Sequence, residues 1–258
     1  MIKQFICLAA ALMLTTSCAV THADDMSGQT LSPSMSVDQI LDAADQAGQN
    51  LKDFDANITL KSEDPVTGDK EKYVGHLWFQ DRGDDNVRMH VLFDKIIVGN
   101  QIKNKQMKEY LLSDGWLTTR NYTKDGGDQN RTQVIKPGQK VNLLKLGEGP
   151  FPLPIGQKKQ DVLAQFNVTK VAPTNDDPAD TVHLKLIPKK DSSLDRKFKT
   201  LDFWLDDKTH MPARIETLDK SGSTDQTTDF SDLHRNNGLK DSDFELPSTH
   251  GDWNKTES

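Results

Sequence analysis

The sequence has very little cysteine. Its 258 residues include two, Cys7 and Cys18, and both lie close to the N-terminus. If an N-terminal segment that contains them is removed, the remaining chain has no thiol. That chain would then have no disulfide, no thiolate metal site and no cysteine nucleophile.

A run of basic residues is also missing. The formal net charge is −7, and the acidic residues are spread along the chain. Nucleic-acid binding depends on clustered Lys and Arg side chains that neutralise phosphates. We therefore expect no nucleic-acid partner, and we interpret the acidic excess as a solvated surface.

The sequence patterns of common catalytic and metal sites are absent. No two histidines in residues 24–258 have the i, i+4 spacing of a helical zinc pair. There is no Gly-x-Ser-x-Gly elbow, Walker loop or dinucleotide-binding fingerprint. We therefore expect no catalytic residue, no metal and no cofactor, and the chain is predicted to bind a ligand and not to be an enzyme.

The longest apolar run lies at the N-terminus. Lys3 precedes the apolar residues 5–14, and Thr21-His22-Ala23 supplies small residues before two aspartates. This order is typical of a secretory signal peptide, here over residues 1–23. The run is too short to anchor the chain across a bilayer. We expect export to the periplasm.

A second interpretation of the N-terminus stays open. The stretch Leu14-Thr15-Thr16-Ser17-Cys18 is close to a lipobox, in which the cysteine becomes the lipidated first residue. Thr15 occupies a place where such motifs usually have an aliphatic residue. Processing at Cys18 would leave the protein attached to a membrane, whereas cleavage after Ala23 would release it.

A polar stretch and an amphipathic helix follow. Residues 24–35 are polar and predict a flexible leader. Ser36 is suited to cap the helix, with Gln39 as its capping-box partner. Apolar residues then recur at helical spacing and form one stripe, at Val37, Ile40, Leu41, Ala44, Ala47 and Leu51.

Most of the remaining chain alternates between apolar and polar residues, as strands do. Polar turns such as Asp219-Lys220-Ser221-Gly222 separate the strands, which predicts an antiparallel meander in the last third of the chain. Residues 124–131 predict a loop. Lys185, Lys199 and Asp202 should face water, as should His76 and His183. The inner face should line an apolar cavity with Ile58, Leu60, Leu77, Phe79, Leu184, Leu186, Leu201 and Phe203.

One apolar segment fits neither a strand nor a helix. In residues 149–157, three prolines alternate with Phe151, Leu153 and Ile155. Proline removes a backbone donor, so this segment cannot be built into the centre of a sheet. Together with Leu163 in a short helix downstream, it predicts either a movable lid over residues 150–166 or a small packed cluster under a loop.

Several short motifs resemble one family when they are taken in order. These motifs are the early strand Gly75-His76-Leu77-Trp78-Phe79, the hairpin Ser113-Asp114-Gly115-Trp116, and the C-terminal stretches MPARIE, LDKSG, DFSDL and DSDFELP. Their order and spacing resemble LolA-type lipoprotein carriers, from about residue 37 to residue 247.

The resemblance implies a fold and a function. The fold is α+β, with a curved antiparallel sheet that forms an unclosed barrel and a helical lid over its concave side. The function is a monomeric carrier that shields the acyl chains of lipidated proteins, or of other lipids. An inner-membrane donor complex and an outer-membrane receptor would be its partners.

The expected organisation is one carrier domain over residues 36–248, followed by a polar tail at 249–258. Two alternatives stay open. A lipidated Cys18 would make the chain a membrane receptor of the same superfamily. The fold could also serve a sensor or regulatory module that binds a partner protein.

Overall fold

The computed structural model describes residues 30–64, 67–83, 86–103, 105–135, 157–222 and 225–258. Within these ranges the chain forms one large sheet and two α-helices, α1 (Val37–Gln49) and α2 (Lys159–Gln165). The strands are β1 (Asp53–Glu63), β2 (Lys70–Asp81), β3 (Val87–Val98), β4 (Gln101–Ile102), β5 (Met107–Ser113), β6 (Trp116–Tyr122), β7 (Gly126–Gln133), β8 (Phe166–Lys170), β9 (Thr181–Pro188), β10 (Phe198–Asp206), β11 (Pro212–Asp219), β12 (Asp225–Arg235) and β13 (Asp252–Glu257).

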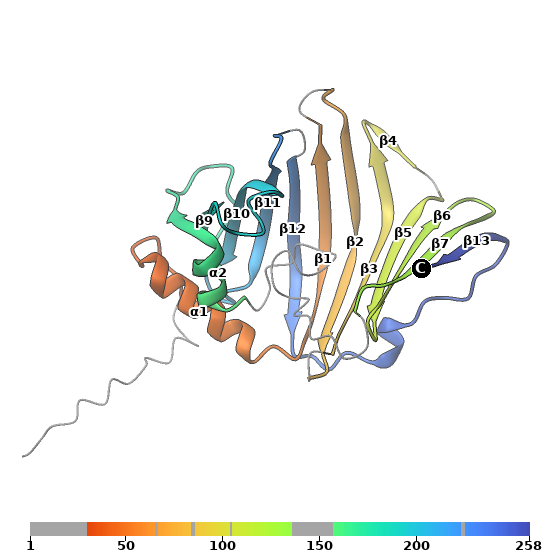
Figure 1. The fold of residues 1–258 in the computed structure, drawn as a ribbon, viewed down its shortest axis with the longest axis horizontal. Helices are drawn as coiled ribbons and strands as arrows, with labels where there is room; N and C mark the ends of the chain where they lie inside the picture. Colours follow the sequence, from red (N-terminus) through yellow and green to blue (C-terminus); the bar gives the residue numbers. More distant parts are fainter. Residues whose placement is uncertain (1–29, 65–66, 84–85, 104, 136–156, 223–224) are drawn as a thin grey trace, which may run out of the picture.

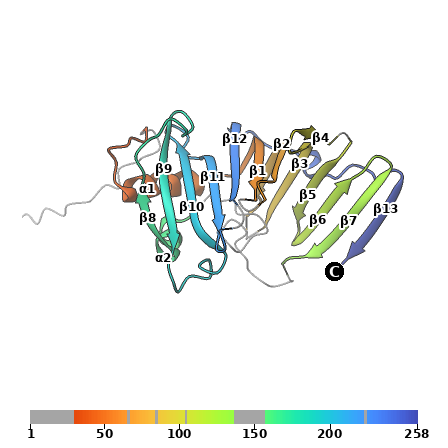
Figure 2. The ribbon, with the colours of Figure 1, turned by 90° about the horizontal axis from the view of Figure 1, so that it is seen from above.

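The sheet is long, curved and open. Its strand order is β13-β7-β6-β5-β3-β2-β1-β12-β11-β10-β9-β8, with β4 paired to β3 outside this path. Neighbouring strands are antiparallel except β13, which runs parallel to β7. The end strands β8 and β13 lie far apart (Figures 1 and 2). The expected fold class, an unclosed barrel with a helical cover, is confirmed.

Both helices lie at the β8–β11 end of the sheet (Figure 1). Helix α1 begins with the expected capping box, in which the Ser36 hydroxyl accepts from the Gln39 amide and the Gln39 side chain accepts from the Ser36 amide. Its apolar stripe is buried against the sheet at Ile40, Leu41, Ala43 and Ala47. Burial of this stripe, more than helix propensity, holds a helix of this length in place.

The prediction of a flexible leader is wrong for residues 31–35. Leu31 and Met35 are buried in the main core. The Leu31 amide donates to the Asp207 carbonyl at 2.7 Å. The Lys170 ammonium donates to the carbonyl oxygens of Pro33 and Met35. Leu31 and Met35 are two apolar side chains in an otherwise polar stretch. Their burial in the main core holds this stretch in one conformation.

The predicted strand faces are correct for β9. Leu184 is 1% exposed, whereas the side chain of the next residue, Lys185, is 41% exposed. Leu184 pairs with Phe203 across the strands, and Lys185 pairs with Asp202. A slip of one residue would have reversed both faces.

The expectation that Asp202 and His183 face water is wrong. Both lie on the outer face, but Asp202 is 6% exposed and the His183 side chain is 11% exposed. The His183 Nε2 atom lies 2.8 Å from an Asp202 oxygen, and its ring stacks on Trp204 at 4.0 Å between centroids. Trp204 and His183 therefore pack together on the outer face of the sheet, beside Asp202. The alternating pattern alone predicts that His183 and Asp202 face solvent.

The predicted loop at 124–131 is wrong, because most of it forms a strand that pairs with the polar tail at 249–258. Residues 126–133 form β7, and residues 252–257 add β13 beside it. Gly126 allows this close approach, since a Cβ there would lie 1.7 Å from the Asp252 carbonyl oxygen. Neither strand has the apolar alternation that would reveal it in the sequence.

The chain reaches β13 by crossing from the centre of the sheet to its edge. Figure 1 shows this connection, in blue, from the lower end of β12 to β13. Three side chains of the outer sheet face hold it. Arg88 donates to the Asp241 carboxylate at 2.6 Å and Arg120 to the Pro247 carbonyl at 2.7 Å, and the His90 Nδ1 atom lies 2.7 Å from the Asp243 carbonyl oxygen.

Glu109 lies at the centre of these contacts and is 2% exposed. Its carboxylate is 2.9 Å from His90 Nε2 and also accepts from the Tyr122 hydroxyl. Burial raises the pKa of Glu109, but the hydrogen bonds from His90 and Tyr122, with the nearby Arg120 charge, outweigh it and leave the pKa below its ordinary value. The buried carboxylate is therefore ionised at neutral pH.

Candidate functional site

An apolar pocket lies under the helices at one end of the sheet. Its floor is formed by Leu184 and Leu186 of β9 and by Phe203 and Leu205 of β10. Leu184 and Phe203 are direct cross-strand partners, so their side chains share the inner face. Alternation in two neighbouring strands therefore builds one continuous apolar surface.

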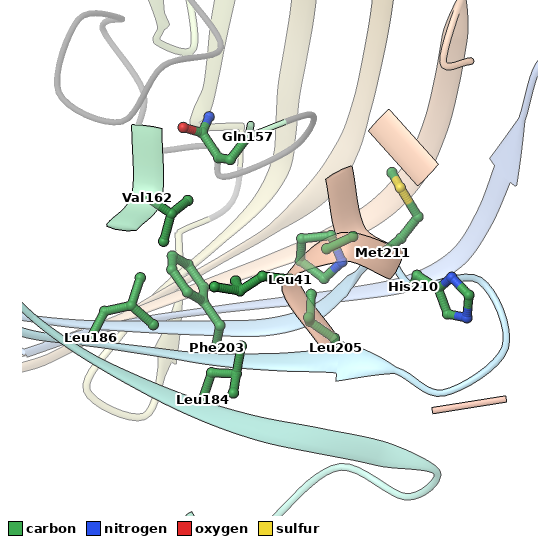
Figure 3. Close-up of a pocket in the computed structure, with 11 residues that line it drawn as sticks. Leu41, Gln157, Val162, Leu184, Leu186, Phe203, Leu205, His210 and Met211 are labelled. Atoms are coloured by element: carbon green, nitrogen blue, oxygen red, sulfur yellow. The ribbon is translucent and has the colours of Figure 1, made fainter. Parts of the chain in front are cut away.

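The roof of the pocket comes from the helices. Leu41 and Ala44 belong to the buried face of α1, and Val162 belongs to α2. Figure 3 shows Leu41 and Val162 beside Phe203. The remaining lining residues that the structure describes are Gln157, His210, Met211 and Pro212.

The pocket is small. Its cavity volume is about 40 Å³, which is room for about three water molecules. A fatty acyl chain is much larger than this space. Any lipid that binds here must therefore displace part of the roof.

The N-terminal end of helix α2 is held to α1 by ion pairs. The Lys159 ammonium lies 2.7 Å from Asp38 and 2.9 Å from Asp42 of α1, and the Lys159 amide donates to Asp45. The hydrogen bond to Asp38 contributes most to raising the pKa of Lys159. Both carboxylates are largely exposed, and ion pairs in such positions contribute about 0–1 kcal/mol each. These contacts define the orientation of α2 but oppose its movement only weakly.

The other end of α1 is anchored by Arg235 of β12. Its guanidinium donates to the carbonyl oxygens of Ala47, in the last turn of α1, and of Thr209. Burial lowers the pKa of Arg235, yet arginine stays charged at neutral pH because its ordinary pKa is so high. Helix α1 is therefore fixed at its C-terminal end. Helix α2 is fixed at its C-terminal end by Lys189, whose ammonium donates to the Leu163 carbonyl and whose amide donates to the Gln165 carbonyl.

The predicted cavity residues divide into two groups. Leu184, Leu186 and Phe203 line the pocket. The others belong to the core of the same inner face: Ile58, Leu77, Phe79 and Leu201 are buried, and Leu60 is partly buried. The structure brings all eight to one face of the sheet, but only three of them to the pocket that it describes.

The sequence does not predict the helical residues that cover the pocket, nor the residues of the β10–β11 turn at its end. Leu41 and Ala44 stand out in the sequence only as part of a helical stripe, which any packed helix shows. His210 and Met211 lie in and after a polar turn, where the sequence carries no sign that they meet α1. A contact between segments so far apart in the chain follows only from the strand order.

The predicted lid falls mostly outside the described residues. Phe151, Leu153 and Ile155 belong to that part of the chain, so their role remains a prediction. Leu163 of α2 is partly buried and packs against the core.

The described ranges contain no group of three or more histidine, aspartate or glutamate side chains placed to hold a metal ion. Within the same ranges, neither helix combines the length and the apolar character needed to cross a membrane.

Comparison with known proteins gives a likeness of fold. No protein-family model matches the chain, and no curated protein matches it. Solved structures do match. A putative outer membrane lipoprotein-sorting protein domain from Vibrio parahaemolyticus is 14% identical, with a TM-score of 0.36, over 80% of this chain and 95% of that one. A LolA superfamily protein from Nitrosomonas europaea is 12% identical, with a TM-score of 0.31, over 82% and 98%.

A third match is the MucA/MucB complex of Pseudomonas aeruginosa, at 12% identity and a TM-score of 0.45. The match covers 81% of this chain but 60% of that one. A lipoprotein-sorting domain and a LolA superfamily protein are therefore among the solved structures to which this chain is similar.

Proposed function

We propose that this protein is a periplasmic carrier that takes the acyl chains of lipidated proteins, or of other lipids, into the apolar pocket between β9–β11 and the helices. The observation that supports it best is the composition of that pocket. Nine of its eleven described lining residues are apolar, and ligand pockets for apolar groups have this character.

Transfer of hydrocarbon from water into such a pocket is favourable by about 0.8 kcal/mol per methylene. The small pocket must first widen, and we expect the movement at the N-terminal end of α2, where exposed ion pairs connect it to α1. Loading and release then need only this movement and a membrane or receptor that competes for the chains. No covalent step is required, so we propose no enzymatic activity.

Ala44 offers a direct test, because it lines the pocket from α1 and is only partly buried. Ala44→Leu fills the space with a larger apolar side chain. We expect it to bind a fluorescent fatty acid at least about tenfold more weakly, since overfilling a packed site costs ~1–3 kcal/mol. Ala164→Leu is the matched control, because it makes the same change on the exposed face of α2. Equal affinity in the two variants would place the lipid elsewhere.

The lipid-anchored receptor is the second candidate, and residues 14–18 support it. The mass of the protein isolated from its native host separates the two. A chain that begins near Asp24 supports the soluble carrier. A chain that begins at Cys18 and carries a diacylglycerol supports the membrane receptor. Native mass spectrometry of the same sample would identify a co-purified lipid.

A further inference from the structure

A second pocket lies beside the apolar one, and it is basic. It lies between the C-terminal end of α1 and the turn that joins β10 to β11, and its cavity volume is about 180 Å³. Three of its lining residues carry basic side chains, namely Lys208, His210 and Arg235. None of its described lining residues is a carboxylate.

The charge of Arg235 is not paired with a carboxylate of the described residues. Its guanidinium donates to the carbonyl oxygens of Ala47 and Thr209, and its Nε atom is buried with no hydrogen-bond partner among the described residues. A guanidinium has five N–H donors, so Arg235 retains donors beyond those that anchor α1.

The turn contains two acidic residues, Asp206 and Asp207, and neither of them lines the basic pocket. The Asp206 carboxylate accepts from the amides of Lys208 and Thr209 and from the Thr209 hydroxyl. Asp206 therefore stabilises the turn and is not among the residues that line the pocket.

The C-terminal end of α1 would normally repel an anion, because its free carbonyl groups carry partial negative charge. Here three carbonyl groups at this end accept hydrogen bonds. Arg235 donates to Ala47, the Leu51 amide donates to Gly48, and the Asn236 side chain donates to Asn50. The helix end therefore opposes an anion less than an uncapped one would.

The two pockets meet at His210, which lines both. Figure 3 shows His210 at the end of the apolar row that lies farthest from Leu186 and Val162. A ligand that follows the apolar pocket from Leu186 toward His210 would therefore reach the basic pocket at its end.

We propose that the pair of pockets binds an anionic amphiphile, with its hydrocarbon chain against β9 and β10 and its carboxylate or phosphate group in the basic pocket formed by Lys208, His210 and Arg235. The inference rests on the proposed function and specifies its ligand class. Charge-assisted hydrogen bonds to such an anion are stronger than those to a neutral headgroup.

The test compares hexadecanoate, hexadecyl phosphate and hexadecanol, which share one chain length, as competitors of a fluorescent fatty acid. We expect at least one of the two anions to bind about tenfold or more tightly than the alcohol. Lys208→Gln should reduce this preference at least about threefold and leave the affinity for hexadecanol unchanged. Lys199→Gln, an exposed lysine of β10 outside both pockets, is the control and should behave as wild type.

The outcomes separate this inference from the proposed function. Equal binding of the anions and the alcohol would overturn the headgroup site and leave the carrier intact. An anion preference that Lys208→Gln and Arg235→Gln both leave unchanged would also overturn it, provided that the Arg235 variant is folded by circular dichroism. Binding of inorganic phosphate without any amphiphile would show a free-anion site, and binding of none of the probes would overturn both proposals.

Discussion

Glu109 shows how a single buried charge can organise a distant part of the chain. In the sequence, His90, Glu109 and Arg120 are ordinary polar residues on outward strand positions. In the structure, the C-terminal connection covers them, and each of the three is at most 8% exposed. A carboxylate buried with partners is costly to disrupt, because removing one partner leaves the others desolvated.

Glu109→Ala should therefore lower the free energy of unfolding by about 3–5 kcal/mol. It leaves His90 and Tyr122 without their shared acceptor. Urea denaturation measures the change. Glu257→Ala removes an exposed partner of Arg131 and should cost less than about 1 kcal/mol. Equal losses in the two variants would mean that the buried network does not stabilise the fold.

The same carboxylate predicts a dependence on pH. The folded-state pKa of Glu109 is below its ordinary value, so its contribution is fully present above the unfolded-state pKa of about 4.3. The contribution is lost as the pH falls through the folded-state pKa. The stability difference between wild type and Glu109→Gln should therefore be constant near neutral pH and shrink below about pH 4. A difference that grows on acidification would contradict this assignment.

At the scale of elements, the two helices of the roof are held in different ways. Helix α1 has a capped start, a buried stripe and an arginine at its end. Helix α2 spans seven residues, has no side-chain cap and has one fully buried residue, Val162. An isolated helix of this length is unstable in water, so α2 depends on its contacts with α1.

Lys159→Gln tests this dependence, because it removes the ion pairs to Asp38 and Asp42. We expect faster hydrogen exchange in the amides of α2, with α1 and β9 unchanged, and faster exit of a bound fatty acid. Lys158→Gln alters the neighbouring lysine and is the matched control. Unchanged exchange in α2 would show that apolar packing alone holds the roof closed.

At the opposite end of the sheet, β13 depends on the two glycines that start β7. Gly126→Ala would place a Cβ 1.7 Å from the Asp252 carbonyl oxygen, so β13 must separate. The exposed edge of β7 should then promote association between molecules, which light scattering would detect. A monomeric variant with a protected β13 would show that the pairing tolerates a side chain.

For the whole molecule, the sequence predicts those features that depend on neighbouring residues. The capping box at Ser36 and the strand faces of Leu184 and Lys185 follow from local patterns, whereas the curved, unclosed sheet is what the resemblance to LolA-type carriers implies. The wrong predictions share one cause. Leu31, Asp202 and β13 acquire their environment from segments far away in the chain, and local alternation holds no information about such contacts.

The apolar pocket also combines features that local sequence patterns predict with features that depend on distant contacts. Its floor could be predicted from the alternation of β9 and β10. Its roof, its small volume and the adjoining basic pocket could not be predicted, because they depend on where α1, α2 and the turn at His210 meet the sheet.

The most direct test of lipid binding is to map where a lipid lies. A fatty acid with a photoreactive diazirine in its chain, crosslinked to the purified protein, should label peptides that contain Leu41, Leu184, Leu186, Phe203 or Met211. An excess of unlabelled fatty acid should abolish this labelling, and Ala44→Leu should reduce it. Labelling concentrated on β5 and β6, or labelling that unlabelled fatty acid does not displace, would contradict an acyl-chain site under the helices.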